Sequence, residues 1–395
     1  MTDVCRPNVP SLLNAVREIE PIIRAHASQA ESERDLPDSV AKALREHGLY
    51  RLWRPKAFGG LEVDPMSALR VFEEVSRIDS AAGWNLQLSC AVDPFLAWFT
   101  DEGAQEILQD QNAILGGAFF PPRQAVAVDG GYRVTGQTPF VSGAKQCQWF
   151  FGLAQIFDGT TPRLAISGEP VTLFTACPSS EAVIVDNWRT LGMRGTGSHD
   201  VLMTDMFVPE RHTALLAPRQ TAGGAYQGPL YNLTIWPPVA SPAPIATGIA
   251  RAAIDELLNL AGRKSPAYTV KPLSDRSGVQ LIIGEAEAML GAARAYLYES
   301  LQHVWDKAVS GQMIDLSGKI KVQLAATHAV EAAAKAVDLV HAAVGTTGIR
   351  DEHPFQRHFR DVHTITQHGF ISRSRYESVG QLVLGVPVEW PFYTL

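Results

Sequence analysis

The pattern of hydrophobic and polar residues divides the chain into three parts. Apolar residues recur at helical spacing from residue 10 to about residue 115, which predicts helices that share a core. From residue 113 to about residue 216, apolar and polar residues alternate between turn sequences such as Asp129-Gly130-Gly131, a pattern typical of β-strands. Long alanine-rich stretches follow, as in helices that pack closely in a bundle. Periodicity alone therefore predicts a helical part, a β part and a second helical part.

Local signals predict where several helices begin and end. We expect Asp38 to cap a helix that stops at Gly48, and Asp64-Pro65 to open another that runs to about Ile78. The nearly apolar stretch 80–100 predicts one long buried helix. In the last part, long helices are expected over residues 246–260, 275–301, 316–344 and 354–384.

Composition narrows the class of protein. With 395 residues, 46% of them hydrophobic and 19% charged, the chain is expected to fold as a globular protein of two or three domains. A net charge of −7 without a basic stripe argues against nucleic acid as a partner. The sequence shows neither an apolar run that could span a bilayer nor a signal segment, so we expect a cytoplasmic protein. The scattered cysteines, Cys5, Cys90, Cys147 and Cys177, fit reduced thiols there.

The richest stretch for chemistry lies near the end of the chain. A glycine-bounded loop carries Thr346 and Thr347, whose hydroxyl and backbone N–H groups are available to an anion. A predicted helix then follows Pro354, carries the sequence R-x-x-R-D over residues 357–361, and reaches His368. Histidines also occur at 353, 358 and 363, but a five-residue spacing turns about 140° per step on a helix. They therefore share no face, and we expect no metal site.

The β part contains further blocks in a specific order. These are Gly-Tyr-Arg-Val-Thr-Gly at 131–136, Phe-Val-Ser-Gly-Ala at 140–144, Trp-Arg-Thr-Leu-Gly-Met-Arg-Gly-Thr-Gly-Ser at 188–198, and Val-Pro-Glu at 208–210. Together with the R-x-x-R-D helix, they resemble the acyl-CoA dehydrogenase superfamily over essentially the whole chain. The resemblance implies a mainly α fold with a central β-barrel: an N-terminal helical domain (1–115), a β-barrel domain (116–222) and a C-terminal four-helix bundle (223–395).

One replacement separates this chain from the dehydrogenases of that superfamily. There a Tyr-Glu-Gly-Thr run follows the R-D pair, and its glutamate removes the α-proton of the substrate; the aligned run here is His368-Gly369-Phe370-Ile371. A histidine near this place resembles the two-component flavin monooxygenase branch (group D), which includes aromatic hydroxylases and dibenzothiophene-type monooxygenases. The resemblance implies reduced FMN from a separate NAD(P)H:flavin reductase, with FAD as the alternative. It also implies O₂ addition at flavin C4a and hydroxylation of an aromatic or heteroaromatic molecule, by analogy of indole or phenol type.

The resemblance also assigns the catalytic residues. Ser142 is expected to hydrogen-bond flavin N5, although a serine before a glycine is often only a turn hydroxyl. His368 is expected to accept a substrate proton or to donate to the peroxide, because an imidazole titrates near neutrality. A histidine packed in the core is the ordinary alternative. Phe140 and Trp188 are expected beside the flavin, where a buried barrel tryptophan would have the same sequence signature.

A second set of residues is expected to bind the flavin phosphate. Thr346 and Thr347 resemble the loop that reaches the flavin of a neighbouring subunit, and Arg276 could add positive charge there. A solvated arginine at a helix end is an equal alternative for Arg276. A homotetramer built through the C-terminal bundles would follow.

The substrate side departs from the branch. Many members carry another histidine on the helix near residues 84–95, but this chain has none there, and Trp84, Asn85 and Ser89 are our substrate-binding candidates. Two other functions stay open: an acyl-CoA dehydrogenase with a displaced base, and a flavin-binding homologue without catalysis. The first bundle helix offers no acid before Asp255 for such a base. We therefore prefer the monooxygenase.

Overall fold

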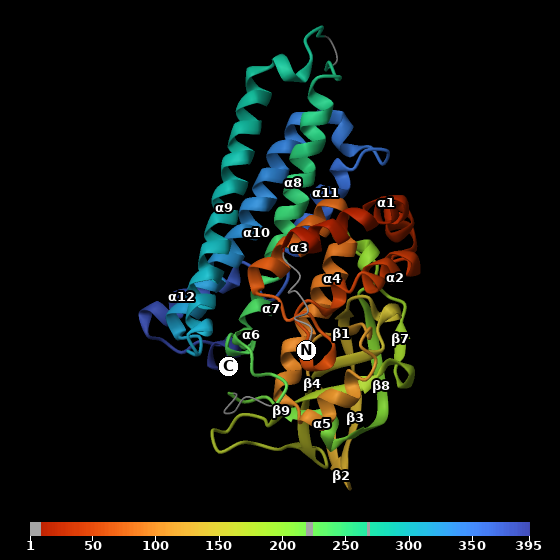
Figure 1. The fold of residues 1–395 in the computed structure, drawn as a ribbon, viewed down its shortest axis with the longest axis vertical. Coiled ribbons are helices and arrows are strands. Elements are labelled where there is room, and N and C mark those ends of the chain that lie inside the picture. The colour runs from red at the N-terminus through yellow and green to blue at the C-terminus, as the bar shows by residue number, and fades with distance from the viewer. Residues whose placement is uncertain (1–8, 219–223, 267–268) are drawn as a thin grey trace, which may run out of the picture.

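The computed structural model describes residues 9–218, 224–266 and 269–395, and Figure 1 shows their arrangement. From Val9 onward, the N-terminal part holds five α-helices: α1 (Val9–Glu33), α2 (Asp38–Glu46), α3 (Pro65–Ile78), α4 (Ser80–Val92) and α5 (Asp101–Ile107). Nearly every residue of α4 is buried, because this helix lies where the other parts of the chain meet. Among the described residues, no helix is both long and apolar enough to cross a bilayer.

The helix signals in this part are confirmed only in part. Asp64 caps α3 as predicted, accepting a 2.9 Å hydrogen bond from the Ser67 amide. Asp38 does not cap α2; it lies in the first turn, after Pro37 at the cap position. The helix expected over 80–100 is shorter, because Pro94 lacks an N–H and the chain continues from Asp93 to Trp98 as a 3₁₀ turn.

The middle part is one nine-stranded sheet with the path β7-β8-β3-β2-β4-β6-β9, while β1 and β5 pair with β4. Its strands are β1 (Leu115–Gly117), β2 (Arg123–Val128), β3 (Gly131–Val141), β4 (Trp149–Asp158), β5 (Thr161–Pro162), β6 (Thr172–Pro178), β7 (Val183–Val185), β8 (His199–Pro209) and β9 (Thr213–Leu215). The predicted turn at 129–131 joins β2 to β3 as an antiparallel hairpin. In the β3–β8 ladder Val141 pairs with His199, which brings the adjoining Ser142 and Ser198 together.

The last part is helical. It contains α6 (Pro229–Asn232), α7 (Trp236–Ala240), α8 (Pro242–Ala261), α9 (Ser277–Val309), α10 (Leu316–Val344), α11 (Phe355–Ile365) and α12 (Ser374–Leu384). Figure 1 shows α8, α9 and α10 side by side, extending away from the sheet. The helix predicted over 316–344 is confirmed as α10, whereas the one expected over 354–384 is wrong. The chain leaves the helix after Ile365, and the His368 carbonyl accepts from the amides of Ile371 and Ser372, which stabilises a turn instead.

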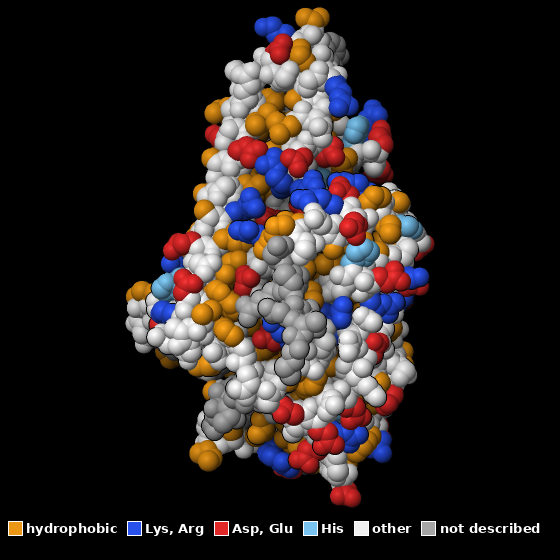
Figure 2. Space-filling view, in the orientation of Figure 1, with side chains coloured by type: hydrophobic (Ala, Val, Ile, Leu, Met, Phe, Trp, Pro, Cys, Tyr) orange, Lys and Arg blue, Asp and Glu red, His pale blue; other side chains and the backbone are white. Residues whose placement is uncertain are grey.

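The three parts form the acyl-CoA dehydrogenase-like arrangement that the motifs predict. Helix α5 ends at Ile107 before β1, and β9 ends at Leu215 before α6. These element ends do not fix a single residue as the boundary between parts, so the domain boundaries expected at 115 and 222 stay predictions. Cys90, Cys147 and Cys177 are free and buried, and Cys5 lies outside the described residues. Figure 2 shows basic and acidic side chains interspersed on the visible face, without a stripe of one sign.

Helix α3 joins the N-terminal part to the bundle through a close crossing with α8. The Ser76 hydroxyl donates to the Ile245 carbonyl at 2.8 Å, and the Glu73 carboxylate accepts from Thr247 Oγ1 at 2.6 Å. Gly248 allows this approach, since a Cβ there would lie 2.5 Å from the Glu73 carbonyl oxygen. The crossing thus depends on a residue without a side chain.

Two glycines in bundle helices are expected to respond oppositely to alanine. Gly248→Ala on α8 should lower the free energy of unfolding by about 1–3 kcal/mol, because the added methyl overpacks the crossing. Gly291→Ala on α9 should raise it by about 0.5–1 kcal/mol, because a Cβ there meets nothing within 4 Å and alanine is the better helix former. Urea unfolding of both variants measures this. Equal effects of the two changes would contradict the close crossing.

Candidate functional site

Trp84 on α4 contacts both residues that the motifs assign to catalysis. Its Nε1 donates a 3.0 Å hydrogen bond to Ser142 Oγ, at the end of β3. Its ring meets the His368 ring edge-on, with ring centres 5.2 Å apart. Three segments that are distant in sequence therefore bring an indole, a hydroxyl and an imidazole into one site.

Ser142 is the first of three hydroxyl groups in a hydrogen-bonded row. Its Oγ lies 2.7 Å from Ser198 Oγ, which lies 2.6 Å from Thr196 Oγ1. Thr196 donates its proton to the Met193 carbonyl at 2.8 Å. Thr196 must then accept from Ser198, and Ser198 from Ser142, because each hydroxyl has one proton. The Ser142 proton therefore points to Ser198, and the Ser142 oxygen accepts from Trp84.

Asp361, from the R-x-x-R-D sequence, fixes the segment that supplies this row. Its buried carboxylate accepts from the Met193 amide at 2.6 Å and from the Ser80 hydroxyl at 2.5 Å. Burial raises the pKa of Asp361 to about 6, against the opposing effects of Ser80 and Arg357. This carboxylate joins α11, the N-terminus of α4 and the 188–198 loop, a role that the sequence did not reveal.

Gly192 and Arg360 fix the same loop from its other side. The Arg360 guanidinium donates to the Leu191 carbonyl at 2.6 Å and pairs with Glu31 at 2.8 Å. A Cβ at Gly192 would lie 2.3 Å from the Arg360 carbonyl oxygen, so only glycine fits there. The motif residues of α11 thus position the loop, and the loop positions the hydroxyl row.

His368 is half-buried in the turn after α11, between Trp84 and Phe370, whose ring centre lies 5.4 Å away. Burial lowers its pKa to about 4, so the expectation of titration near neutrality is wrong. Nδ1 accepts a long, 3.4 Å hydrogen bond from the Phe370 amide. The neutral ring therefore carries its proton on Nε2, which has no partner among the described residues. His368 is placed as a hydrogen-bond donor.

Three residues could take the place of the missing second histidine, namely Asn85, Ser89 and Asp93, and Asn85 has an unpartnered polar atom next to Ser142. Its Nδ2 donates to the Ala81 carbonyl at 3.1 Å, while its buried Oδ1 has no partner among the described residues. That oxygen faces the backbone beside Ser142: a Cβ at Gly143, where φ is +63°, would lie 2.6 Å from it. A buried acceptor without a donor is what a ligand N–H or O–H satisfies. We regard it as the clearest sign that the site is built to hold a ligand.

Ser89 and Asp93, by contrast, fasten α4 to its neighbours. Ser89 Oγ accepts from the Leu115 amide at 3.0 Å, which attaches β1. Asp93 forms a fully buried ion pair with Arg54 at 3.1 Å, and burial, opposed by Arg54, raises the pKa of Asp93 to about 6. Both contacts are with the protein itself, and the substrate role predicted for Ser89 stays a prediction.

Phe140 and Trp188, both expected beside a flavin, lie together, and their place beside a flavin stays a prediction. Their rings meet edge-on with centres 6.0 Å apart, and Trp188 Nε1 donates to the Met193 carbonyl at 3.0 Å. Trp188 is buried, whereas Phe140 is 63% exposed and sits in the left-handed backbone region with φ of +63°. An exposed aromatic ring next to the hydroxyl row leaves an apolar surface for a planar group.

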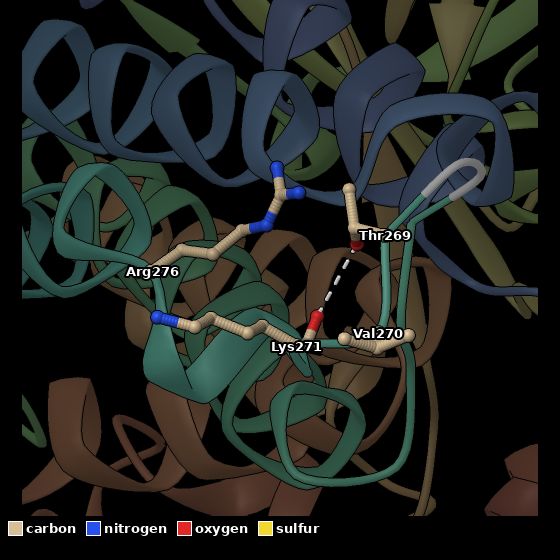
Figure 3. Close-up of a pocket in the computed structure, with 4 residues that line it drawn as sticks. All are labelled: Thr269, Val270, Lys271 and Arg276. Atoms are coloured by element: carbon tan, nitrogen blue, oxygen red, sulfur yellow. Dashed lines mark hydrogen bonds between the residues drawn. The ribbon is translucent and has the colours of Figure 1, made fainter.

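The residues expected at the flavin phosphate form a second group at the outer end of the bundle. Thr346 is exposed, and Thr347 is buried and bonded to the ammonium group of Lys264, which also donates to the Val344 carbonyl at 2.5 Å. Arg276 lines an open pocket of about 660 Å³ with Thr269, Val270 and Lys271, where the Arg276 and Lys271 side chains lie side by side (Figure 3). In Figure 1 this end points away from the sheet that carries Ser142.

The cationic residues at this end suit a phosphate. Lys264 lies close enough to Arg350 that burial and this second positive charge lower the pKa of Lys264. Sequence reasoning missed Lys264, because a lysine just after a helix end is ordinary. Among the described residues, no cluster of side chains has the composition of a metal site.

Comparisons with known proteins agree with this architecture. Residues 12–112 match the family model of the acyl-CoA dehydrogenase N-terminal domain, and residues 240–373 that of the acyl-CoA dehydrogenase C-terminal domain. An indole-3-acetate monooxygenase of Pseudomonas putida is 31% identical over 96% of this chain and 94% of its own. The oxygenase component of an FADH(2)-dependent resorcinol hydroxylase from a Rhizobium species is 29% identical, with coverages of 96% and 94%.

A solved structure shows the same fold. The HsaA monooxygenase from M. tuberculosis superposes with a TM-score of 0.87 at 26% identity, covering 96% of this chain and 98% of the other. These relatives match almost the full length of the chain. The chain therefore belongs to the acyl-CoA dehydrogenase superfamily and, within it, to the two-component flavin-dependent monooxygenases, as its motifs predict.

Proposed function

We propose that this protein is a cytoplasmic oxygenase component that uses reduced flavin from a separate NAD(P)H:flavin reductase and O₂ to hydroxylate an aromatic or heteroaromatic small molecule. The observation that carries the proposal is His368: a neutral imidazole with a free Nε2–H lies beside Trp84 and Ser142, where a dehydrogenase requires a carboxylate base. Without a general base the α-proton of an acyl thioester is not removed.

The carboxylates near the site do not supply that base. Asp361 accepts from Met193 and Ser80, and Asp93 is paired with Arg54 through Oδ1. Asp255, the first acid on α8, is paired with Arg251 at 2.9 Å. Asp93 Oδ2 has no partner among the described residues, but the side chain is fully buried beside Arg54. The alternative of a dehydrogenase with a displaced base thus finds, among these three residues, no carboxylate that is both unpaired and accessible.

The aromatic surroundings support the substrate class. Beyond His368 the rings of Phe370, Phe392 and Phe119 follow one another, with neighbouring centres 5.4 Å and 6.2 Å apart. The first pair meets edge-on and the second at a tilt, and an aromatic surface of this kind favours a flat, apolar guest. Relatives named for indole-3-acetate and resorcinol, both aromatic, fit a substrate of indole or phenol type.

For the cofactor we propose reduced FMN, with FAD as the alternative because one relative is named for FADH(2). Phe140, Ser142 and Trp188 would hold the ring system, while Arg276, Thr346 and Thr347 of a neighbouring subunit would hold the phosphate. This division requires an oligomer, which we propose is a homotetramer. Titration with FMN and with FAD tests which flavin is preferred. Light scattering with and without flavin tests the oligomeric state.

When bound, reduced flavin supplies the two electrons with which O₂ is divided between product and water. The hydroxyl row then recognises the redox state. Ser142 gives its proton to Ser198, so it offers a neighbouring flavin only an acceptor lone pair. A reduced flavin carries an N–H at N5, whereas an oxidised flavin has a lone pair there. The row therefore favours the reduced form, while His368 holds a proton at Nε2 for an oxygen atom.

The redox preference is expected to depend on Ser198. In Ser198→Ala the Ser142 proton loses its acceptor and becomes free to point elsewhere. The ratio of the oxidised-flavin Kd to the reduced-flavin Kd should then fall about tenfold, because an unsatisfied polar contact costs about 1–3 kcal/mol. Anaerobic titrations of both redox states measure the ratio. Thr175→Val is the control, since that buried hydroxyl donates only to the Gly152 carbonyl. An unchanged ratio of the two Kd values in Ser198→Ala would contradict the role of the hydroxyl row.

Replacing His368 should uncouple oxygen consumption from product. With reductase, flavin, ¹⁸O₂ and a panel of indole, indole-3-acetate and resorcinol, the native protein should form product labelled with one ¹⁸O. His368→Ala should lose about 10²–10⁴-fold in product formation and release hydrogen peroxide instead, with little change in flavin binding. His358→Ala is the control and should keep its coupling, because this half-buried imidazole on α11 also has a pKa lowered by burial but is not among the residues that contact Trp84. Intact coupling and a lower Tm in His368→Ala would show that His368 only packs.

The neutral state of His368 predicts a specific dependence of stability on pH. Its folded pKa of about 4 lies below its unfolded value of about 6.5, so its contribution is full above pH 6.5 and is lost as the pH falls through 4. The difference in unfolding free energy between the native protein and His368→Gln should therefore shrink between pH 6.5 and pH 4. Urea unfolding at both pH values tests this. A difference that stays constant or grows on acidification would place the charged imidazole in the folded state.

A further inference from the structure

The chain after α12 folds back onto the aromatic wall of the site. Phe392 is buried, and its ring centre lies 5.4 Å from that of Phe370. Trp390 lies 5.7 Å from Phe370 and 4.7 Å from Phe392. Lys319 on α10 anchors the end of this segment by donating to the carbonyl oxygens of Tyr393 at 2.9 Å and Leu395 at 2.7 Å. The wall beside His368 is therefore completed by the last residues of the chain.

Arg375, in the first turn of α12, stacks on this wall. Its guanidinium carbon lies 3.9 Å from the centre of the Trp390 ring. Nη2 donates to the Ser374 hydroxyl at 3.0 Å, but Nε and Nη1 are buried without a partner among the described residues. No described carboxylate lies within 4 Å of the guanidinium nitrogens, in contrast to Arg373 two residues earlier, which pairs with Glu331 at 3.2 Å.

Two further donors near Arg375 are unsatisfied in the same way. The Trp390 indole N–H and the Tyr393 hydroxyl are buried, and neither has a partner in the part of the chain that the structure describes. The Arg375 nitrogens and the Trp390 indole nitrogen are donors only, and although the Tyr393 oxygen can accept as well as donate, no hydrogen bond joins these three groups. The fully buried Arg54 differs, since its Nε, Nη1 and Nη2 reach Asp93 and the carbonyls of Gln111 and Ala113. A buried cationic group whose N–H donors have no acceptor is the kind of site that an anion satisfies.

We propose that Arg375, Trp390 and Tyr393 bind the carboxylate of an aromatic acid whose ring lies against Phe370 near His368. The proposal rests on the oxygenase function and names its substrate class. A guanidinium binds a carboxylate through two parallel N–H groups, and Nε with Nη1 offers one such edge. Phe370 lies between Trp390 and His368, with ring-centre separations of 5.7 Å and 5.4 Å, which suits an acid with a short side chain on its ring.

Entry of the carboxylate requires Trp390 to move. The unpartnered donors have almost no solvent-accessible surface, because the Trp390 ring covers the guanidinium. Residues 383–387, which precede Trp390 in the chain, are exposed. The movement can therefore be confined to this segment. A carboxylate replaces the stacking contact with two charge-assisted hydrogen bonds, which are the stronger interaction.

The test compares the binding of an acid with that of its uncharged parent, without turnover. Isothermal titration of the full-length protein with indole-3-acetate and with indole gives the two Kd values. The native protein should bind the acid at least about tenfold more tightly, the effect of 1.4 kcal/mol or more. Arg375→Gln should abolish this preference and leave the Kd of indole within about twofold, whereas Arg375→Lys should retain part of it. Arg373→Gln, which removes the neighbouring paired arginine, should keep the full preference.

Equal affinities for acid and indole in the native protein, or a preference that survives in Arg375→Gln, would overturn the proposal. A preference that Arg373→Gln removes equally would also overturn it, because a general surface charge would then suffice. Tm values of the variants show whether each is folded. If labelled hydroxylated product still forms while the acid preference is absent, the oxygenase function stands and only the anion site is lost.

Discussion

The structure depends on one buried carboxylate. Asp361 accepts from the Ser80 hydroxyl on α4 and from the Met193 amide in the loop between β7 and β8, while it belongs to α11 of the bundle. The three parts of the chain therefore meet at this side chain. Its pKa is raised because the folded protein buries it, and the two hydrogen bonds offset that cost only in part. Burying this carboxylate costs free energy, and what it provides in return is a fixed position for the 188–198 loop.

Placement of that loop gives the site its chemistry. The loop supplies Thr196 and Ser198, which direct the Ser142 proton, and Trp84 on the α4 helix joins Ser142 to His368. The same scaffold with a glutamate after α11 would present a base to an acyl thioester. With a neutral histidine, a donor-rich site results that suits an oxygen atom. We propose that this one replacement accounts for the change of reaction class, while the remainder of the framework is shared.

The sequence predicted those features that short, ordered motifs encode. The R-x-x-R-D helix led to His368, the Phe-Val-Ser-Gly block led to Ser142, and the helix near residues 84–95 led to Trp84 as a substrate-binding candidate. The structure brings these three together. The sequence did not predict the end of α11, because the turn after Ile365 is stabilised by hydrogen bonds to the His368 carbonyl and no proline there signals the end of a helix. The pKa of His368 was wrong, since desolvation by surrounding rings depends on tertiary packing. The sequence did not indicate a role for Arg375 for the same reason, because Trp390 and Tyr393 come close to it only when the chain folds back.

The central claim is that the site directs reduced flavin and O₂ toward oxygen transfer. Rapid mixing of the anaerobic reduced-flavin complex with oxygen tests it most directly, because absorbance separates an oxygenated flavin from the oxidised one before any substrate is known. The account predicts a transient absorbance that precedes the oxidised spectrum, and a shorter-lived transient in Ser142→Ala. Direct appearance of oxidised flavin in a single phase, together with reduction of the flavin by an acyl thioester, would contradict the account and indicate a dehydrogenase.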